Sequence, residues 1–170
     1  MFCHKRTLAA DKPSRQAKFV KLLRGVVPLT LLAEEKQAIV VDKILTIKKK
    51  QTFKGGDVEM DIESVTEQNQ GGVGKVYAIK MNLKQTTDGG GPNDYTWRNS
   101  LHNRIVLEDA KGNKFNNWGS SWSGSGPNHV ALTLNFRDAG NGNPPAKLIY
   151  KQWVTVQEAV MFEFKDLPLP

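Results

Sequence analysis

The sequence holds one cysteine, Cys3, among its 170 residues. A single thiol cannot form an internal disulfide, and it cannot supply the cysteine cluster of a structural zinc site. No run approaches the roughly 18 apolar residues that a transmembrane helix needs. Motifs that identify common enzyme sites, such as HExxH, GxSxG and the phosphate-binding P-loop, are missing as well. The function therefore has to be inferred from folded surfaces rather than from a motif.

Acidic residues are scarce at the start of the chain. Residues 1–25 hold seven lysines and arginines against Asp11 alone, whereas the remainder holds 17 basic and 16 acidic side chains. We therefore predict a basic N-terminal extension over residues 1–37 and a nearly neutral domain over residues 38–170. A nucleic acid or an anionic membrane is a candidate partner of this extension only. The interpretation that we favour is a solvated, partly disordered extension without such a partner.

Apolar side chains in the extension follow a helical spacing. Phe19, Leu22, Leu23 and Val26 fall at i, i+3, i+4 and i+7, which predicts a short amphipathic helix. One alternative is a strand laid against the domain. Another is the hydrophobic core of a signal peptide over residues 26–33.

From Ala38 onward, apolar and polar residues alternate, as in antiparallel strands with one buried face. The clearest segments are DVEMDIESV, KVYAIKMNL and HVALTLNF, with glycine-rich turns around them. We expect the first two to pair as a hairpin, and Gly112 to adopt a positive φ in a later turn. Residues 147–156 and 160–164 are expected to close the sheet as two segments. The prolines of LPLP should then end the sheet and lie along its edge.

Seven or eight such segments predict an all-β fold. We expect an antiparallel two-sheet sandwich, immunoglobulin-like in architecture but without the disulfide of that fold. A single sheet closed on itself is the alternative. The carboxylates of residues 57–63 alternate with apolar side chains, so we expect them on the solvent face, where they favour solubility rather than acid–base chemistry.

Few groups suit catalysis or metal binding. His102 and His129 lie at expected strand starts beside loops, and either one next to a carboxylate would make a hydrolase site, which is the enzyme alternative. Asp88, Asn93 and Asp94 offer oxygen ligands, but not in the order of a calcium loop. We predict that the protein is not an enzyme and has no catalytic residues, metal or cofactor.

The strongest candidate for ligand binding is NNWGSSWSGSGPN, which we predict to be a loop. Trp118 and Trp122 offer flat apolar rings there, and Asn117 and Asn128 offer polar partners. Indoles beside amides suit recognition of a sugar or a protein. A carbohydrate-binding module is therefore an alternative function. In the other interpretation, the tryptophans fold back and cap an open end of the sandwich.

Several segments resemble one group of bacterial proteins. LEDAKGNKF, GSSWSGSG and the ending PAKLIYKQW…FEFKDLPLP look like the C-terminal part of uncharacterised bacterial β-sandwich proteins, and the resemblance extends over residues 38–170. It implies an immunoglobulin-like domain of an exported protein, located in the periplasm, in the envelope or outside the cell, with no catalytic residues. The resulting hypothesis is a non-catalytic interaction or structural module with a protein or carbohydrate partner.

Overall fold

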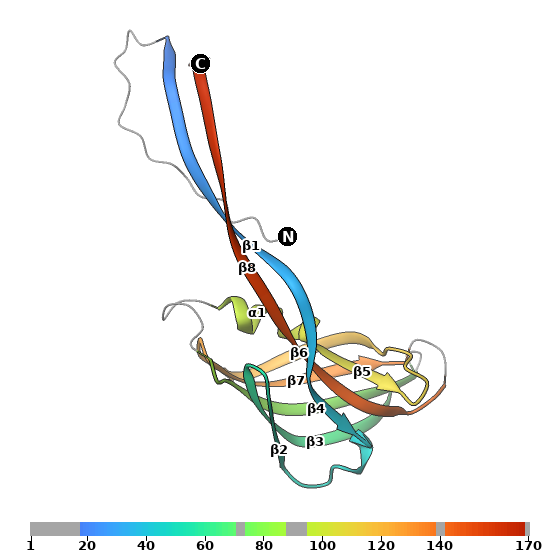
Figure 1. The fold of residues 1–170 in the computed structure, drawn as a ribbon. Coiled ribbons are helices and arrows are strands. Elements are labelled where there is room, and N and C mark those ends of the chain that lie inside the picture. The colour runs from blue at the N-terminus through green and yellow to red at the C-terminus, as the bar shows by residue number, and fades with distance from the viewer. Residues whose placement is uncertain (1–17, 71–73, 88–94, 139–141, 169–170) are drawn as a thin grey trace. The chain divides into compact units, whose positions relative to one another are not determined.

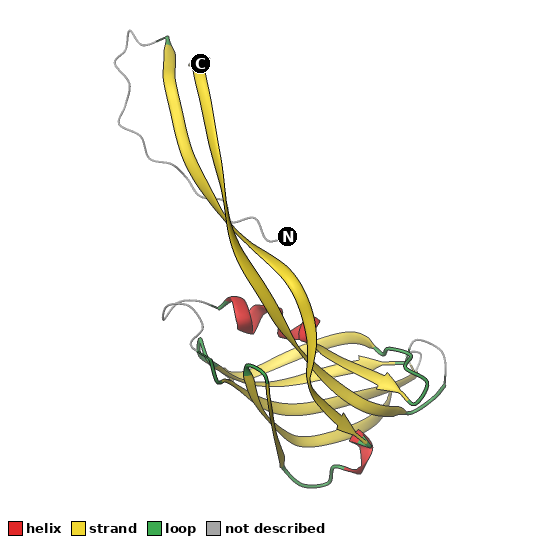
Figure 2. Cartoon of the chain, in the orientation of Figure 1, coloured by secondary structure: helices red, strands yellow, loops and turns green. Residues whose placement is uncertain are grey.

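The computed structural model describes residues 18–70, 74–87, 95–138 and 142–168. Figures 1 and 2 show that most of these residues are in strands. In chain order the elements are β1 (Phe19–Asp42), a 3-10 turn (Ile44–Thr46), β2 (Gln51–Gly55), β3 (Val58–Gln70), β4 (Gly74–Gln85), α1 (Thr96–Arg104), β5 (Ile105–Asp109), β6 (Asn116–Ser125), β7 (His129–Arg137) and β8 (Pro145–Pro168).

The strands form two antiparallel sheets, which confirms the all-β sandwich. The larger sheet has the order β2-β3-β4-β7-β6, and the smaller has the order β1-β8-β5. The predicted hairpin is β3 and β4, whose register runs from Val58 opposite Gln85 to Gln70 opposite Gly74. Gly112 has the expected positive φ, 83°.

The chain groups by its contacts into two units. The larger unit, Glu35–Trp153, contains the five-stranded sheet, α1, β5 and the adjoining parts of β1 and β8. The smaller unit comprises residues 1–34 and 154–170, so it joins the start of the chain to its end. Its described part consists of the other segments of β1 and β8.

The helix predicted around residues 19–26 is wrong, because these residues belong to β1. Two residues of the helical pattern, Phe19 and Leu23, also belong to an alternating series that continues through Val27, Leu29 and Leu31, so the apolar spacing is compatible with a strand as well. Pairing with β8 decides in favour of the strand. The proline within β1 is tolerated because β1 is the edge of its sheet, where one side of the backbone needs no ladder partner.

The two closing segments predicted over residues 147–164 are also one element. β8 is a single strand of 24 residues that reaches Pro168. Leu167 and Pro168 are its last residues, so this half of LPLP belongs to the strand. The final two residues lie outside the described part of the chain.

Alternation builds the core of the larger unit as predicted. In β7 the residues Val130, Leu132, Leu134 and Phe136 are each at most 1% exposed. The apolar residues of β3 and β4 that were expected to face inward are buried with them, and so are Leu148 and Tyr150 from β8, and Ile105 and Leu107 from β5. The face of the five-stranded sheet that carries the buried side chains of β3, β4 and β7 is called the core face below, and the opposite one the outer face.

A carboxylate organises the turn after β5. Asp109 accepts hydrogen bonds from the backbone N–H groups of Lys111 and Asn113 at 2.8 Å, and from the side-chain amides of Asn113 and Asn143. The Asn113 side chain contributes most to lowering the pKa of Asp109, from 3.8 to about 2. Asp109, the first residue of the DAKGN turn, therefore stabilises this turn through its hydrogen bonds.

Candidate functional site

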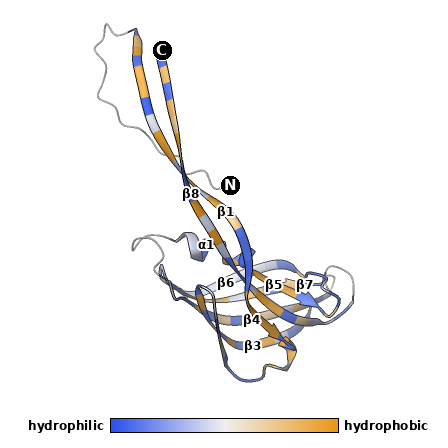
Figure 3. Cartoon of the chain, in the orientation of Figure 1, coloured by the Kyte–Doolittle hydropathy of each residue, from blue (hydrophilic) through white to orange (hydrophobic). Residues whose placement is uncertain are grey.

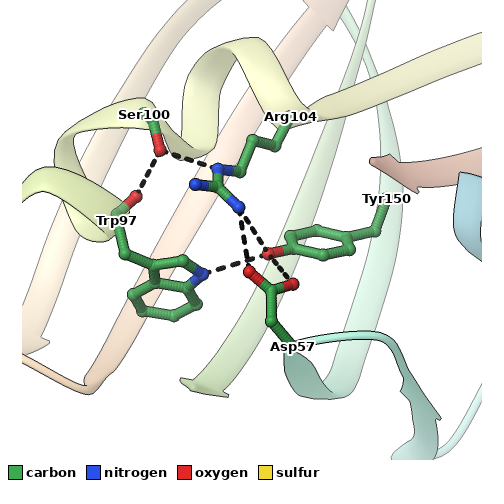
Figure 4. Close-up of polar contacts among 5 residues, drawn as sticks. All are labelled: Asp57, Trp97, Ser100, Arg104 and Tyr150. Atoms are coloured by element: carbon green, nitrogen blue, oxygen red, sulfur yellow. Dashed lines mark hydrogen bonds and ion pairs between the residues drawn. The ribbon is translucent and has the colours of Figure 1, made fainter. Parts of the chain in front are cut away.

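Five side chains meet in the interior of the larger unit (Figure 4). Asp57 comes from the turn between β2 and β3, Tyr150 comes from β8, and Trp97, Ser100 and Arg104 come from α1. Each is at most 7% exposed, so their polar atoms need partners within the protein. We call these five residues the Asp57 cluster.

An ion pair and a tyrosine hydroxyl form the centre of the Asp57 cluster. Nη1 of Arg104 lies 3.0 Å from Oδ2 of Asp57, and the Tyr150 hydroxyl donates to Oδ1 at 2.9 Å. Nε1 of Trp97 donates to the hydroxyl oxygen of Tyr150 at 3.0 Å. Burial, followed by the nearby charge of Asp57, raises the pKa of Tyr150 above its usual value of 10.0. The phenol therefore stays protonated and keeps donating to the carboxylate.

The guanidinium of Arg104 is held from its other side as well. Its Nε donates to Oγ of Ser100 at 2.7 Å, and Ser100 donates in turn to the carbonyl of Trp97 at 2.7 Å. The ring of Trp153 lies 4.8 Å from the guanidinium carbon, within cation–π range. These groups satisfy one another, so the chemistry that the arrangement supports is structural: it ties α1 to the start of β3 and to β8.

The Asp57 cluster was not predicted from the sequence. The expectation that Asp57 faces solvent is wrong, because this residue lies in the turn before the alternating strand begins and pairs with a residue 47 positions later. A signal for α1 was present, since Trp97 and Leu101, and also Ser100 and Arg104, are four residues apart. This spacing places each pair on one face of a helix.

The two predicted ligand-binding tryptophans lie in β6, not in a loop. The loop prediction is wrong because β6 pairs with β7 over its whole length, from Asn116 opposite Arg137 to Ser125 opposite Val130. The ladder hydrogen bonds hold a glycine- and serine-rich segment that has little strand propensity of its own. β6 is also the last strand of its sheet, so its other edge is not paired within the sheet.

Trp122 lies on the core face, at the edge of the sheet. It stands opposite Leu132, which is buried in the core, yet the indole itself is 43% exposed. The guanidinium carbon of Arg98 lies 5.7 Å from the centre of the Trp122 ring and 4.7 Å from that of Tyr95. Trp122 thus belongs to an aromatic and arginine group at the start of α1.

Trp118 lies with Arg137, whose guanidinium carbon is 5.2 Å from the centre of the indole. Arg137 follows the buried Phe136 in β7, so its side chain points to the outer face. Trp118 is 51% exposed there. The two tryptophans are therefore on opposite faces of the sheet and do not form one binding platform.

The two asparagines predicted to assist them are also apart. Oδ1 of Asn117 accepts a hydrogen bond from the backbone N–H of Gly119 at 3.1 Å, which occupies it within β6. Asn128 lies in the turn between β6 and β7, where its carbonyl oxygen accepts a hydrogen bond from the backbone of Gln85. The structure does not gather the four predicted residues into one site, and their role in ligand binding stays a prediction.

The histidines also occupy separate places. His102 is exposed in α1 rather than at a strand start, whereas His129 begins β7. His129 lines a cavity of about 250 Å³ on the outer face together with Glu59 and Asp61. Within the described ranges, no hydrogen bond joins either imidazole to a carboxylate.

The carboxylates of that cavity are engaged by lysines. Glu59 pairs with Lys54 at 2.9 Å and Asp61 with Lys50 at 2.7 Å. Among the residues that the structure describes, no group of three or more histidine, cysteine, aspartate or glutamate side chains is placed to hold a metal ion. The oxygen ligands considered in the sequence, Asp88, Asn93 and Asp94, lie outside the described residues.

Comparison of the chain with protein-family models, with curated protein sequences and with solved structures gives no match. Within the described part of the chain, no helix has the length and apolar character needed to span a membrane.

Proposed function

We propose that this chain is a non-catalytic interaction module that binds a protein partner through the strand pair of its smaller unit. The observation that carries the proposal is the distribution of exposed apolar residues. Of the fourteen large hydrophobic side chains exposed among the described residues, ten belong to this unit. They lie in β1 and β8, along which hydrophobic stretches recur (Figure 3). Apolar side chains gathered in this way mark interaction surfaces.

The strand pair needs a partner to be stable. Residues 19–34 of β1 and 154–168 of β8, which we call the ribbon, are the only described elements of the smaller unit. Two strands alone are marginally stable in water. The ion pair between Arg24 and Glu163 has an N–O distance of 2.6 Å, but it is exposed and contributes less than about 1 kcal/mol. A protein that covers the apolar side chains would supply the missing stabilisation.

The larger unit supports the same proposal as a rigid scaffold. The polar groups of the Asp57 cluster bond with one another, an arrangement typical of a structural role. The resemblance to exported bacterial sandwich proteins fits a module of this kind, and we include a location outside the cytoplasm in the proposal. The two alternatives that remain are an enzyme that uses His102 or His129 and a sugar-binding module.

The proposal is tested by the size of the complex that the tagged full chain forms in extracts of its native host. We expect wild type to elute well above its 18.9 kDa mass. The variant Val160→Glu, which places a charge on the ribbon, should elute near the monomer. Elution of wild type itself as a monomer would contradict the proposal.

A second candidate function is sugar binding on the outer face. The observation that favours it is the half-exposed indole of Trp118, which Arg137 holds among the polar side chains of β6 and β7. A flat apolar ring with hydrogen-bonding groups nearby suits the face of a sugar ring.

The two tryptophans provide a matched test of sugar binding. We expect Trp118→Ala to abolish retardation of the protein in polysaccharide affinity gels, and Trp122→Ala to leave it unchanged, because only Trp118 lies on the outer face. Retardation that is equal in both variants and in wild type would exclude this site.

A further inference from the structure

We infer that the partner of the ribbon is the ribbon of a second copy of this chain, packed face to face as a twofold symmetric dimer. The inference rests on the proposed function and names its partner. It depends on which side chains share a face of the ribbon, on the charges of the two strands and on the area available.

Contacts across the ribbon assign its two faces. A Cβ atom built on Gly25 would lie 2.3 Å from the Phe162 ring, so this ring covers the glycine. The rings of Phe162 and Phe164 are 5.6 Å apart, as expected for neighbours on one face. Arg24 directly precedes Gly25, and Glu163 lies between Phe162 and Phe164. The ion pair between Arg24 and Glu163 therefore lies on the other face.

Alternation from Gly25 and Phe162 then gives a nearly continuous apolar face. We call it the Phe162 face; its members are Leu23, Val27, Leu29, Leu31, Val156, Val160, Phe162 and Phe164. Five of these eight side chains are between 39% and 51% exposed. Alternation places three charges on this face: Glu158, between Val156 and Val160, and Lys21 and Asp166, beyond Leu23 and Phe164. The other face is mixed, since it carries Arg24 and Glu163 as well as Met161.

A second copy suits the size of this face. At about 3.3 Å per residue and about 4.8 Å between strands, the face measures on the order of 50 Å by 10 Å, or about 500 Å². Two copies would then bury about 1,000 Å² together, which reaches the lower limit of specific protein interfaces. Two sheets packed about 10 Å apart are also the ordinary way for a strand pair to bury an apolar face.

Charge fixes the orientation of the two copies. Residues 19–34 carry two basic side chains and one acidic, a net charge of +1, whereas residues 154–168 carry three acidic side chains and one basic, a net charge of −2. A twofold axis parallel to the strands places β1 of one copy over β8 of the other, basic strand over acidic strand. An axis across the strands would instead stack like charges.

The experiment is sedimentation equilibrium of the purified full chain and two neighbouring variants. Val160→Glu places a charge on the Phe162 face, and Met161→Glu places the same charge on the other face. We expect wild type and Met161→Glu to sediment at about twice the 18.9 kDa chain mass, and Val160→Glu as a monomer. Its dimer should be weakened at least about 100-fold, since an unpaired carboxylate would be buried. Glu158→Leu should tighten the dimer about tenfold by removing the charge that lies between Val156 and Val160 on that face.

Crosslinking checks the orientation independently of stability. In a Cys3→Ser background, Leu23→Cys protein mixed with Phe164→Cys protein should be linked by a short bismaleimide, because the axis along the ribbon keeps both positions at the same end. The mixed product of Leu23→Cys with Leu31→Cys should be much rarer, since eight residues of strand separate these positions by about 26 Å. Equal yields of the two mixed products would overturn the orientation.

Three results would overturn the inference. The first is a wild-type protein that is monomeric at about 100 µM, far above the Kd range of specific complexes. The second is equal dissociation of the dimer by Val160→Glu and by Met161→Glu. The third is a monomer that floats with phosphatidylcholine–phosphatidylglycerol vesicles and loses this binding in Val160→Glu, which would make the partner a lipid surface. A pure protein that is monomeric but enters a large complex in host extracts refutes the second copy and leaves the proposed function standing. Monomers in both settings refute both.

Discussion

Replacing Asp57 with alanine is expected to lower the free energy of unfolding by about 3–5 kcal/mol, because the variant leaves Arg104 charged, buried and without its partner. Tyr150 would lose the acceptor of its hydroxyl group in the same step. Urea unfolding followed by tryptophan fluorescence measures the change, since Trp97 and Trp153 both adjoin the cluster.

The matched control for this variant is Glu63→Ala. Glu63 also forms an ion pair within the larger unit, with Lys80 at 2.7 Å, but its side chain is 31% exposed. Its loss should cost less than about 1 kcal/mol. Combining Asp57→Ala with Arg104→Met should recover part of the stability, because no uncompensated charge then remains. If Asp57→Ala costs no more than Glu63→Ala, the cluster does not hold the larger unit together.

Replacing Gly55 with valine is expected to lower the free energy of unfolding by about 2–3 kcal/mol, through steric overlap. A Cβ atom at Gly55 would lie 2.1 Å from the carbonyl oxygen of Ala38, and backbone cannot move aside as a flexible side chain can. The same turn positions Asp57, so the strain would also disturb the ion pair with Arg104. Urea unfolding again provides the measurement.

Gly119 offers the comparison. It is also a strand glycine, but nothing lies within 4 Å of a Cβ atom built on it. Gly119→Val should change stability by less than about 0.5 kcal/mol, as is usual for surface substitutions. Equal losses in the two variants would mean that valine is unfavourable for a general reason rather than because of contact with Ala38.

The buried face of the sandwich could be predicted because alternation is a local property. In β7 the pattern of Val130, Leu132, Leu134 and Phe136 states which side is buried without reference to any other strand. The β3–β4 hairpin followed for the same reason, since its strands are neighbours in the sequence. In these elements the local sequence preference and the tertiary contacts both favour a strand, so the prediction from sequence was correct.

The remaining elements depend on distant partners. β6 is a strand because β7 lies beside it, although glycine and serine favour a loop. The segment around Leu23 is compatible with a helix and a strand, and only β8 decides between them. Asp57 is buried because Arg104 and Tyr150 reach it from 47 and 93 residues away. Neither the faces of Trp118 and Trp122 nor the Asp57 cluster could be found without those pairings.

The ribbon has a consequence for the time course of synthesis. Arg24 contacts Glu163 across 139 residues of sequence, so the apolar segment of β1 is made long before the strand that pairs with it. At about 5–20 residues per second, the delay is on the order of ten seconds. During this interval the segment is an unpaired apolar strand on the nascent chain, the kind of intermediate that aggregates or binds chaperones. Its basic side chains, which repel one another between neighbouring chains, are well placed to keep it soluble until β8 is made.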